Sequence, residues 1–373
     1  MKLRMLILLS LITVLSCKKA EKETVAPDTN SSAFFVGTYT DGNSKGIYRY
    51  ALNDDGSLDS IGVMAETINP SFLAKTTDGR YLLAVNEVSN IDSMGTVSSY
   101  KIAKDSLLFN NKSASGGTDP CHITINDAGY TLVANYSSGS VGLLQVHSDG
   151  MLSPLLDSYQ HQGSGSTERQ KGPHAHSDWF YGPDHFISVD LGTNALWFSK
   201  IDTTADKIVL TSPDTLKMHA GAGPRHLALH PNKKWIYVIN ELNSTIQQVL
   251  KTNDSTYTPG ITVSTLPVDF SGESYCADIH ISKDGRFLYG SNRGHNSIAI
   301  FSIDPENGNL STLGYEPVHG NWPRNFTFSP DEKFLLVANQ RSDNIVSFKR
   351  DAETGLLEYL SEIHAPSPVC LLF

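Results

Sequence analysis

Several kinds of residue and pattern are scarce in this chain of 373 residues, and each scarcity excludes a class of protein. Basic residues are outnumbered, with 29 Lys and Arg against 39 Asp and Glu, so the formal net charge is −10. Nucleic-acid binding depends on phosphate contacts from a basic surface, and we therefore expect no nucleic-acid partner. Beyond residue 32 the sequence has no Pro/Ser-rich linker, no block of like charge and no helical heptad pattern. These absences favour a single domain over two.

Cysteine is also scarce, with four residues in the whole chain. Cys121, Cys276 and Cys370 lie far from the N-terminus and are widely spaced in the sequence. Because their number is odd and their spacing is wide, we expect small buried thiols and treat disulfides as the alternative.

A long hydrophobic run of membrane-spanning length is missing as well. The apolar residues 5–15 follow Lys2 and Arg4 and end at Ser16 and Cys17, which is too short for a bilayer and typical of an export signal. Residues 14–17 (VLSC) resemble a bacterial lipobox, in which Cys17 is lipidated and becomes the mature N-terminus; an uncleaved signal anchor is the alternative. Residues 18–32 would then form a polar tether too poor in apolar side chains to fold alone. We expect an exported lipoprotein, periplasmic or outer-membrane associated, that meets the membrane only through the lipid at Cys17.

What the sequence has instead is a repeat of about 50 residues. Each copy contains an apolar strand led by Pro, a polar turn and a second strand that ends in Asn or a similar residue. The copies begin at Pro70, Pro120, Pro173, Pro224, Cys276, Pro323 and Pro368, with Cys276 in place of Pro. This spacing leaves room for about four short strands per copy, as in a propeller blade. The repeat predicts an all-β, seven-bladed β-propeller over residues 33–373.

The last copy is divided between the two ends of the chain. Residues 368–373 supply only a first strand, whereas residues 34–63 supply a unit that lacks one. Joining them closes the ring and removes two exposed sheet edges, so we expect the last blade to combine N- and C-terminal strands. An open all-β array is the alternative.

The strand directions predict where functional side chains gather. In each blade the first strand leaves one face of the ring and the second returns to it, so residues after the leading Pro and residues after the terminal Asn meet at one mouth of the central channel. The first set is Ser71, Cys121, His174, Arg225, Ala277, Arg324 and Val369. The second set is Tyr39, Glu87, Tyr136, Leu191, Glu241, Arg293 and Gln340.

Three arginines at one mouth of an acidic protein indicate an anionic small ligand. The guanidinium group is a rigid fork of donors suited to carboxylate or phosphate, and it stays charged near neutral pH. Alternatively, Arg225 and Arg293 only pair with Glu241 and Glu87 and neutralise the channel. The two interpretations, ligand binding and charge neutralisation, are compatible, because a carboxylate that orients an arginine also supports a binding site.

The connection before the third copy, residues 162–176, is long, polar and rich in glycine. It leads to the same mouth and is predicted to act as a lid or specificity loop. As a phosphate cradle it lacks the required strand-to-helix setting. His174 and His176 could share a face as metal ligands, but no third ligand lies at a suitable spacing, so we predict no metal and no cofactor.

Four motifs carry a resemblance to a known family: 172–176 (GPHAH), 223–231 (GPRHLALHP), 240–242 (NEL) and 291–295 (SNRGH). Together they resemble the propeller-type 6-phosphogluconolactonase, or lactonase, family, which is related to the carboxy-muconate lactonizing enzyme. The resemblance covers residues 33–373. It implies a metal-independent hydrolase that opens a small anionic or sugar lactone by acid/base catalysis.

The resemblance implies four catalytic residues, His174 (with His176 as the alternative), Arg225, Glu241 and Arg293. The arginines would hold the carbonyl oxygen or the substrate's anionic group, and Glu241 or His174 would take the proton of the attacking water. Which of those two is the base stays open. The substrate-binding candidates at the same mouth are Glu87, Tyr136, Gln170, His176 and Arg324.

The export signal does not fit the family's cytoplasmic phosphosugar. We therefore expect an anionic or sugar lactone without specifying a phosphate. A cyclase of the carboxy-muconate type and a non-catalytic, ligand-binding propeller lipoprotein are the two alternatives. Acid/base competence separates the binding module from the enzyme, because only catalysis needs Glu241 and His174.

Overall fold

The computed structural model describes residues 32–88, 94–204, 207–253 and 256–373. The predicted signal with Cys17, and the predicted tether up to residue 31, lie outside the described residues. No helix in the described part of the chain is long and apolar enough to cross a bilayer.

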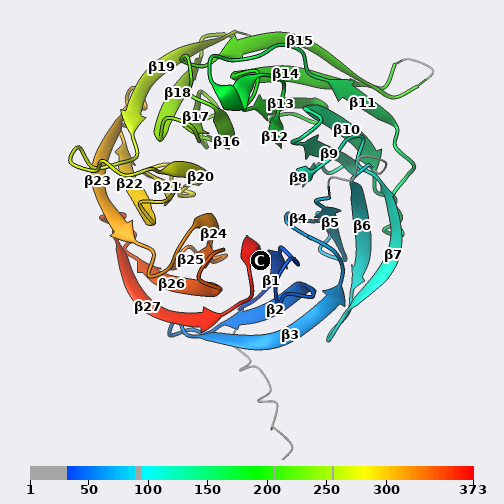
Figure 1. Ribbon diagram of the computed structural model, residues 1–373, viewed down its shortest axis with the longest axis horizontal. Helices are drawn as coiled ribbons and strands as arrows, with labels where there is room; N and C mark the ends of the chain where they lie inside the picture. Colours follow the sequence, from blue (N-terminus) through cyan, green and yellow to red (C-terminus); the bar gives the residue numbers. More distant parts are fainter. Residues whose placement is uncertain (1–31, 89–93, 205–206, 254–255) are drawn as a thin grey trace, which may run out of the picture.

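Seven four-stranded antiparallel sheets are arranged around a central axis, which confirms the predicted seven-bladed propeller (Figure 1). The strands of the first four blades along the chain are β1 (Ser32–Thr38), β2 (Gly46–Leu52) and β3 (Leu58–Glu66); β4 (Leu73–Lys75), β5 (Tyr81–Asn86), β6 (Thr96–Ile102) and β7 (Leu107–Ala114); β8 (Pro120–Ile125), β9 (Tyr130–Asn135), β10 (Ser140–Gln145) and β11 (Asp157–Gln160); β12 (Ala175–Phe180), β13 (His185–Asp190), β14 (Ala195–Asp202) and β15 (Val209–Lys217). Those of the other blades are β16 (Pro224–Leu229), β17 (Trp235–Asn240), β18 (Thr245–Lys251) and β19 (Tyr257–Ser264); β20 (Tyr275–Ile281), β21 (Phe287–Arg293), β22 (Ser297–Ile303) and β23 (Leu310–Pro317); β24 (Pro323–Phe328), β25 (Phe334–Asn339), β26 (Asn344–Arg350) and β27 (Leu357–His364).

The ring closes as predicted, because the C-terminal strand β28 (Pro368–Leu372) is the innermost strand of the sheet β28-β1-β2-β3. Figure 1 shows β28 in red beside the dark blue β1. The two strands are antiparallel, with Val36 opposite Leu371. This blade therefore joins both ends of the described chain.

The hydrophobic core lies between neighbouring blades. The second strand of most blades is buried on both faces, as in β5 (YLLAVN) and β25 (FLLVAN), because each sheet is covered by a blade on either side. One cluster, for example, packs Tyr237 and Ile239 of β17 against Leu288 and Phe301 of the next blade. Cys121, Cys276 and Cys370 are buried free thiols, as predicted.

A register shift interrupts the pairing near the start of several innermost strands. Pro120 pairs with Asn135, Pro224 with Asn240 and Pro323 with Asn339, and in each case the pairing then skips the next residue. The skipped residues are Cys121, Arg225 and Arg324. A bulge of this kind leaves one residue unpaired and re-aims its side chain.

The fourth blade departs from the predicted alignment. Ala175, not Pro173, pairs with Asp190, and the skipped residue is His176. The equivalent of Arg225 in this blade is therefore His176, while His174 lies just before the strand. The reason is that the preceding connection ends two residues later than the repeat suggested.

Candidate active site

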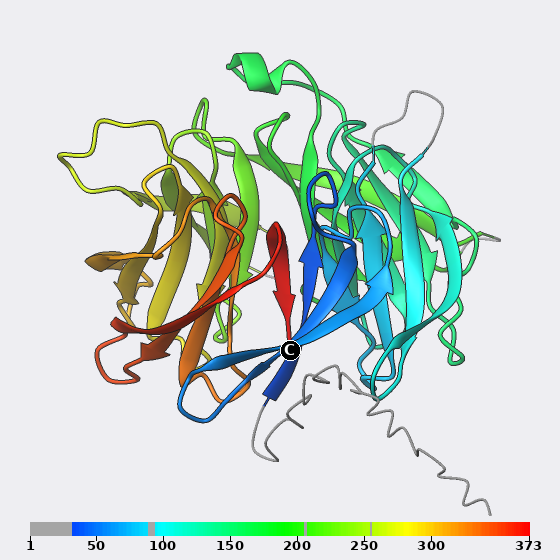
Figure 2. The ribbon, with the colours of Figure 1, turned by 60° about the horizontal axis from the view of Figure 1, so that its bottom comes forward.

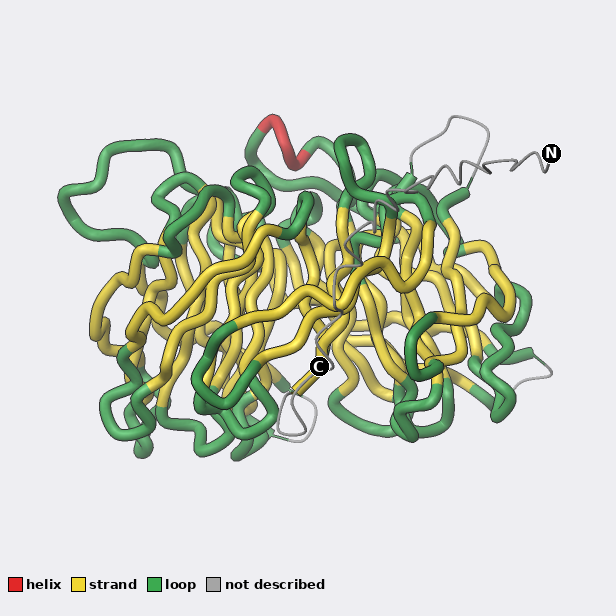
Figure 3. The backbone as a smooth tube through the Cα atoms, turned by 90° about the horizontal axis from the view of Figure 1, so that it is seen from below, coloured by secondary structure: helices red, strands yellow, loops and turns green. Residues whose placement is uncertain are grey.

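The predicted residues gather at one face of the ring, which we call the site face. It is the face at which the innermost strands begin and the second strands end. The short 3-10 helix η1 (Glu168–Gln170) lies over this face, as Figures 2 and 3 show for the segment that rises above the strand ends.

Glu241 is the centre of an ion-pair cluster with three arginines. Its Oε1 lies 2.6 Å from Nη1 of Arg169, and its Oε2 lies 3.1 Å from Nε of Arg225 and 2.7 Å from Nη2 of Arg293. Arg225 also donates from Nη1 to the carbonyl of Ala277, at 2.6 Å. These bonds fix both inner guanidinium groups, and the Nη2 group of Arg225 carries two further N–H donors.

Burial and the neighbouring charges of the cluster shift the pKa values of Glu241 and Arg225. Burial alone would raise the pKa of Glu241, but Arg293, Arg225 and Arg169 hold it at about 2. Burial, together with Arg293 and Arg324, lowers the pKa of Arg225 to about 9. At neutral pH Glu241 is thus an anion and a weak base, and it balances part of the positive charge beside it.

A second group on the site face links Arg324, Tyr39 and Glu87 by hydrogen bonds. Arg324 donates from Nη2 to the hydroxyl of Tyr39 at 2.8 Å, and that hydroxyl donates to Oε1 of Glu87, also at 2.8 Å. Burial raises the pKa of Glu87, although Arg324 opposes this effect. The structure therefore brings Glu87 and Arg324 together through Tyr39.

Tyr136 connects the histidines with the arginine cluster. Its ring stacks on His174 with centroids 4.6 Å apart and meets the edge of His176 at 5.5 Å, while its hydroxyl accepts a hydrogen bond from Arg169 at 3.0 Å. Nδ1 of His174 lies 3.0 Å from the carbonyl oxygen of Tyr136. Since a carbonyl only accepts, Nδ1 donates this hydrogen bond, and in the neutral ring the lone pair is therefore on Nε2.

Gln170 does not belong to this arrangement. Its side chain is completely buried and donates to the carbonyl of Leu191 at 2.8 Å and to Oδ1 of Asn194 at 3.1 Å. Its Oε1 accepts from the backbone of Ser166. Gln170 holds the segment in place, and no contact joins it to Glu241.

The sequence reasoning missed Arg169, the neighbour of Gln170. No periodic pattern predicts the path of a non-repeating connection. The available signals were a basic side chain inside a glycine-rich segment over the predicted mouth and the extension of the family resemblance to residues 168–170. The structure adds this arginine to the set of three that the repeat predicted.

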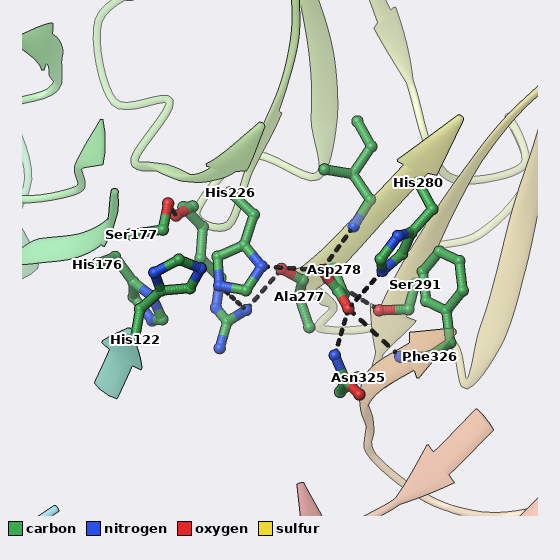
Figure 4. Close-up of polar contacts among 12 residues, drawn as sticks. His122, His176, Ser177, His226, Ala277, Asp278, His280, Ser291, Asn325 and Phe326 are labelled. Carbon is green, nitrogen blue, oxygen red and sulfur yellow. Dashed lines mark hydrogen bonds and ion pairs between the residues drawn. The ribbon is translucent and has the colours of Figure 1, made fainter. Parts of the chain in front are cut away.

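It also missed a cluster of buried histidines, His122, His176 and His226 (Figure 4). The rings of His122 and His176 lie 5.5 and 5.4 Å from that of His226. His226 donates from Nδ1 to Asp278 at 2.8 Å, and Nη1 of Arg225 lies 3.4 Å from its Nε2. A signal was available, because His122 and His226 both stand two residues after a repeat-leading Pro.

These histidines are neutral at neutral pH. Burial lowers the pKa of His226 to about 4, with Arg225 adding to the shift, and it takes those of His122 and His176 well below their usual range. Burial would raise the pKa of Asp278, but His280 and His226 hold it well below its usual range. Among the described residues, no group of three or more His, Cys, Asp or Glu side chains is placed to hold a metal ion.

Known proteins match this chain in sequence and in fold over most of its length. Residues 33–373 match the family described as "Lactonase, 7-bladed beta-propeller". The chain is 38% identical over 347 residues to a 6-phosphogluconolactonase of Bacillus subtilis, covering 91% of this chain and 97% of that one. A Lactobacillus plantarum protein superimposes with a TM-score of 0.86 at 30% identity, covering 92% of this chain and 99% of that one. A periplasmic gluconolactonase of Pseudomonas aeruginosa superimposes with a TM-score of 0.85 at 32% sequence identity. The match covers 91% of this chain and 98% of that one.

Proposed function

The chain belongs to the seven-bladed β-propeller lactonase family, and from this premise we propose that it hydrolyses the ring ester of a small anionic or sugar lactone at its site face. The observation that carries this proposal is the set of fixed guanidinium groups on Glu241, with the stacked His174 nearby. The chemistry needs no metal: water attacks the lactone carbonyl, and the ring carbon–oxygen bond breaks to give a hydroxy acid.

His174 is the base in this proposal, and Glu241 is not. A carboxyl whose pKa is held at about 2 has little affinity for the proton of water. His174 is only partly buried, and since Nδ1 donates to the Tyr136 carbonyl, its neutral ring presents the lone pair of Nε2. Nε2 takes the proton of the attacking water and returns it to the ring oxygen as that oxygen leaves. His176, which is buried between Cys121 and His226, is the comparison residue.

Arg225 and Arg293 stabilise the negative oxygen of the tetrahedral intermediate. Both are buried and are oriented by Glu241, so little reorganisation accompanies the formation of charge. Loss of one donor of this kind typically costs about 3 kcal/mol of transition-state stabilisation. Glu241 acts through the arginines as a positioning residue.

The substrate class follows from the relatives and from the charge of the site. One relative is a 6-phosphogluconolactonase and another a periplasmic gluconolactonase. We propose an exported enzyme, lipidated at Cys17, whose substrate is an aldonolactone with or without an anionic group. Cys17→Ser should release the protein from the membrane fraction, and labelled fatty acid appearing equally in that variant would contradict the lipid anchor.

The decisive experiment measures acid release by the purified protein above the spontaneous rate. The panel contains 6-phosphogluconolactone and gluconolactone, and the consumption of carboxy-muconate, which is not a lactone, is followed separately. His174→Ala should lower kcat by about 10²- to 10⁴-fold, and Arg225→Lys, which loses the forked geometry, by about 10²-fold. The control is His185→Ala, which removes an exposed histidine at the start of β13 and should keep the wild-type rate.

Two results would overturn the proposal in different ways. Cyclisation of carboxy-muconate without hydrolysis of any sugar lactone would favour the cyclase alternative. Binding of these compounds without turnover of any of them would favour a ligand-binding module.

A further inference from the structure

Arg169 differs from the other arginines of its cluster in exposure. Its side chain is 46% exposed, against 2% for Arg225 and 6% for Arg293. An anion that approaches the site face from solvent therefore meets this guanidinium before the other two.

Arg169 is attached to a segment with fixed ends. Both ends of residues 161–174 bind the carboxylate of Asp190: Nδ1 of His161 lies 2.7 Å from Oδ2, and the backbone N–H of His174 donates to Oδ1 at 3.0 Å. The buried Gln170 holds the segment next to Arg169. The guanidinium can thus change partners by rotating its side chain while the backbone stays in place.

The charges around Glu241 permit such an exchange. Arg225 and Arg293 both contact Oε2, so Glu241 remains paired with two buried guanidiniums when Arg169 leaves Oε1. The other partner of Arg169, the Tyr136 hydroxyl, is neutral. A phosphate or carboxylate offers the guanidinium two charged oxygens in the geometry that its fork fits.

We propose that Arg169 is the residue that selects anionic lactones, by leaving Glu241 and Tyr136 and binding the phosphate or carboxylate group of the substrate. This inference rests on the proposed function, since it assigns the part of the lactone that is not hydrolysed. Arg225 and Arg293 remain with the reacting carbonyl, so Arg169 acts on binding and selection rather than on the chemical step.

The test compares selectivity in Arg169→Gln and in a matched control. The selectivity is kcat/KM for 6-phosphogluconolactone, and separately for glucarolactone with its carboxylate, divided by kcat/KM for neutral gluconolactone. In Arg169→Gln we expect this ratio to fall about 10-fold, mainly through KM, because a forked pair with the anion is lost. Whichever anion shows the larger fall is the group that Arg169 prefers.

Lys171→Gln is the control, because it removes one positive charge from the same segment. Lys171 is 73% exposed and pairs with Glu168. It should keep the wild-type ratio. An unchanged ratio in Arg169→Gln, or an equal fall in Lys171→Gln, would overturn the inference.

A binding measurement separates this inference from the proposed function. Calorimetry with 6-phosphogluconate and gluconate should show tighter binding of the phosphorylated acid, and Arg169→Gln should remove about 10-fold of that preference. If the wild type hydrolyses no lactone, the proposed function fails. The difference in binding between the two acids then still shows whether Arg169 binds the phosphate group. If the wild type hydrolyses lactones but shows no preference for the phosphorylated acid over gluconate, only the role of Arg169 fails.

Discussion

Glu241 illustrates how one buried carboxylate sets the state of a whole site. It is 5% exposed and contacts three guanidinium groups. Removing one partner of a buried ion pair leaves uncompensated charge and is strongly destabilising, whereas the intact pair adds little. The same side chain therefore affects stability and, in the proposed mechanism, the position of the arginines.

We predict that Glu241→Gln lowers the free energy of unfolding by about 3 kcal/mol at pH 7, measured with denaturant. The pKa of Glu241 falls from 4.5 to about 2 on folding, so its contribution is complete above pH 4.5 and is lost as the pH falls toward 2. The difference between wild type and variant should therefore shrink over that range. Glu168→Gln, at an 86% exposed side chain, should change stability by less than about 0.5 kcal/mol. A difference that stays constant with pH would contradict this account.

The buried histidines predict a second pH effect at higher pH. Burial takes the pKa of His122 well below its usual 6.5, so the unfolded chain binds a proton that the folded chain does not. Stability is then complete above pH 6.5 and falls as the pH is lowered. His122→Phe, which keeps a ring beside Phe72, should reduce that slope by up to about 1.4 kcal/mol per pH unit. Unfolding curves between pH 7 and 5 measure it, and parallel slopes would refute it.

Among elements, the segment over the site face depends on one carboxylate. Asp190 is fully buried and accepts hydrogen bonds from His161, from the backbone of His174 and from the backbone of Thr193. Both ends of the segment therefore lie on the same side chain, and weakening either bond loosens the segment without touching the blades.

Asp190→Asn should make trypsin cleave after Arg169 or Lys171 at least about 10-fold faster. Asparagine keeps an acceptor for the two backbone N–H groups but presents an NH₂ donor to the protonated Nδ1 of His161. Asp184→Asn is the control, because it alters a similar but exposed pair with His185 on a turn. Equal cleavage rates in the two variants would show that Asp190 does not hold the segment.

The repeat predicted most elements because apolar strand residues and Asp/Gly turns recur at fixed spacing. The ends of the second strands at Asn86, Asn135 and Asn240 follow directly from the sequence. The fourth blade was misaligned by two residues, because Pro173 marks the end of the connection and the ladder begins at Ala175. Arg169 was not predicted, since its position depends on the anchors at Asp190 and Gln170 rather than on any period.

At the scale of the molecule, ring closure depends on six residues at the C-terminus. Val369, Cys370 and Leu371 are buried, and the backbone N–H of Leu371 donates to Oδ1 of Asn325 in the neighbouring blade. Without β28, the edge of β1 and the side of the adjacent blade would be open to solvent.

Deleting residues 368–373 should therefore give insoluble or non-cooperatively folding protein. Solubility, chromatographic size and thermal unfolding measure the outcome. Deleting residues 1–31 is the control, because it leaves every described strand in place. A truncated chain that stays soluble, monomeric and cooperative would show that the ring does not need closure.

The direction of β1 has a consequence for how substrate enters the site and product leaves it. The strand starts at Ser32 on the face opposite the site face and runs toward Tyr39, whose hydroxyl binds Arg324 (Figure 2). If Cys17 carries a lipid, as proposed, the chain that leads from it joins the propeller at Ser32, on the face opposite the arginines. The attachment point and the arginines would then lie on opposite faces of the ring. Its substrate would then arrive by diffusion from the aqueous compartment, and the acid formed would return there rather than toward the lipid surface.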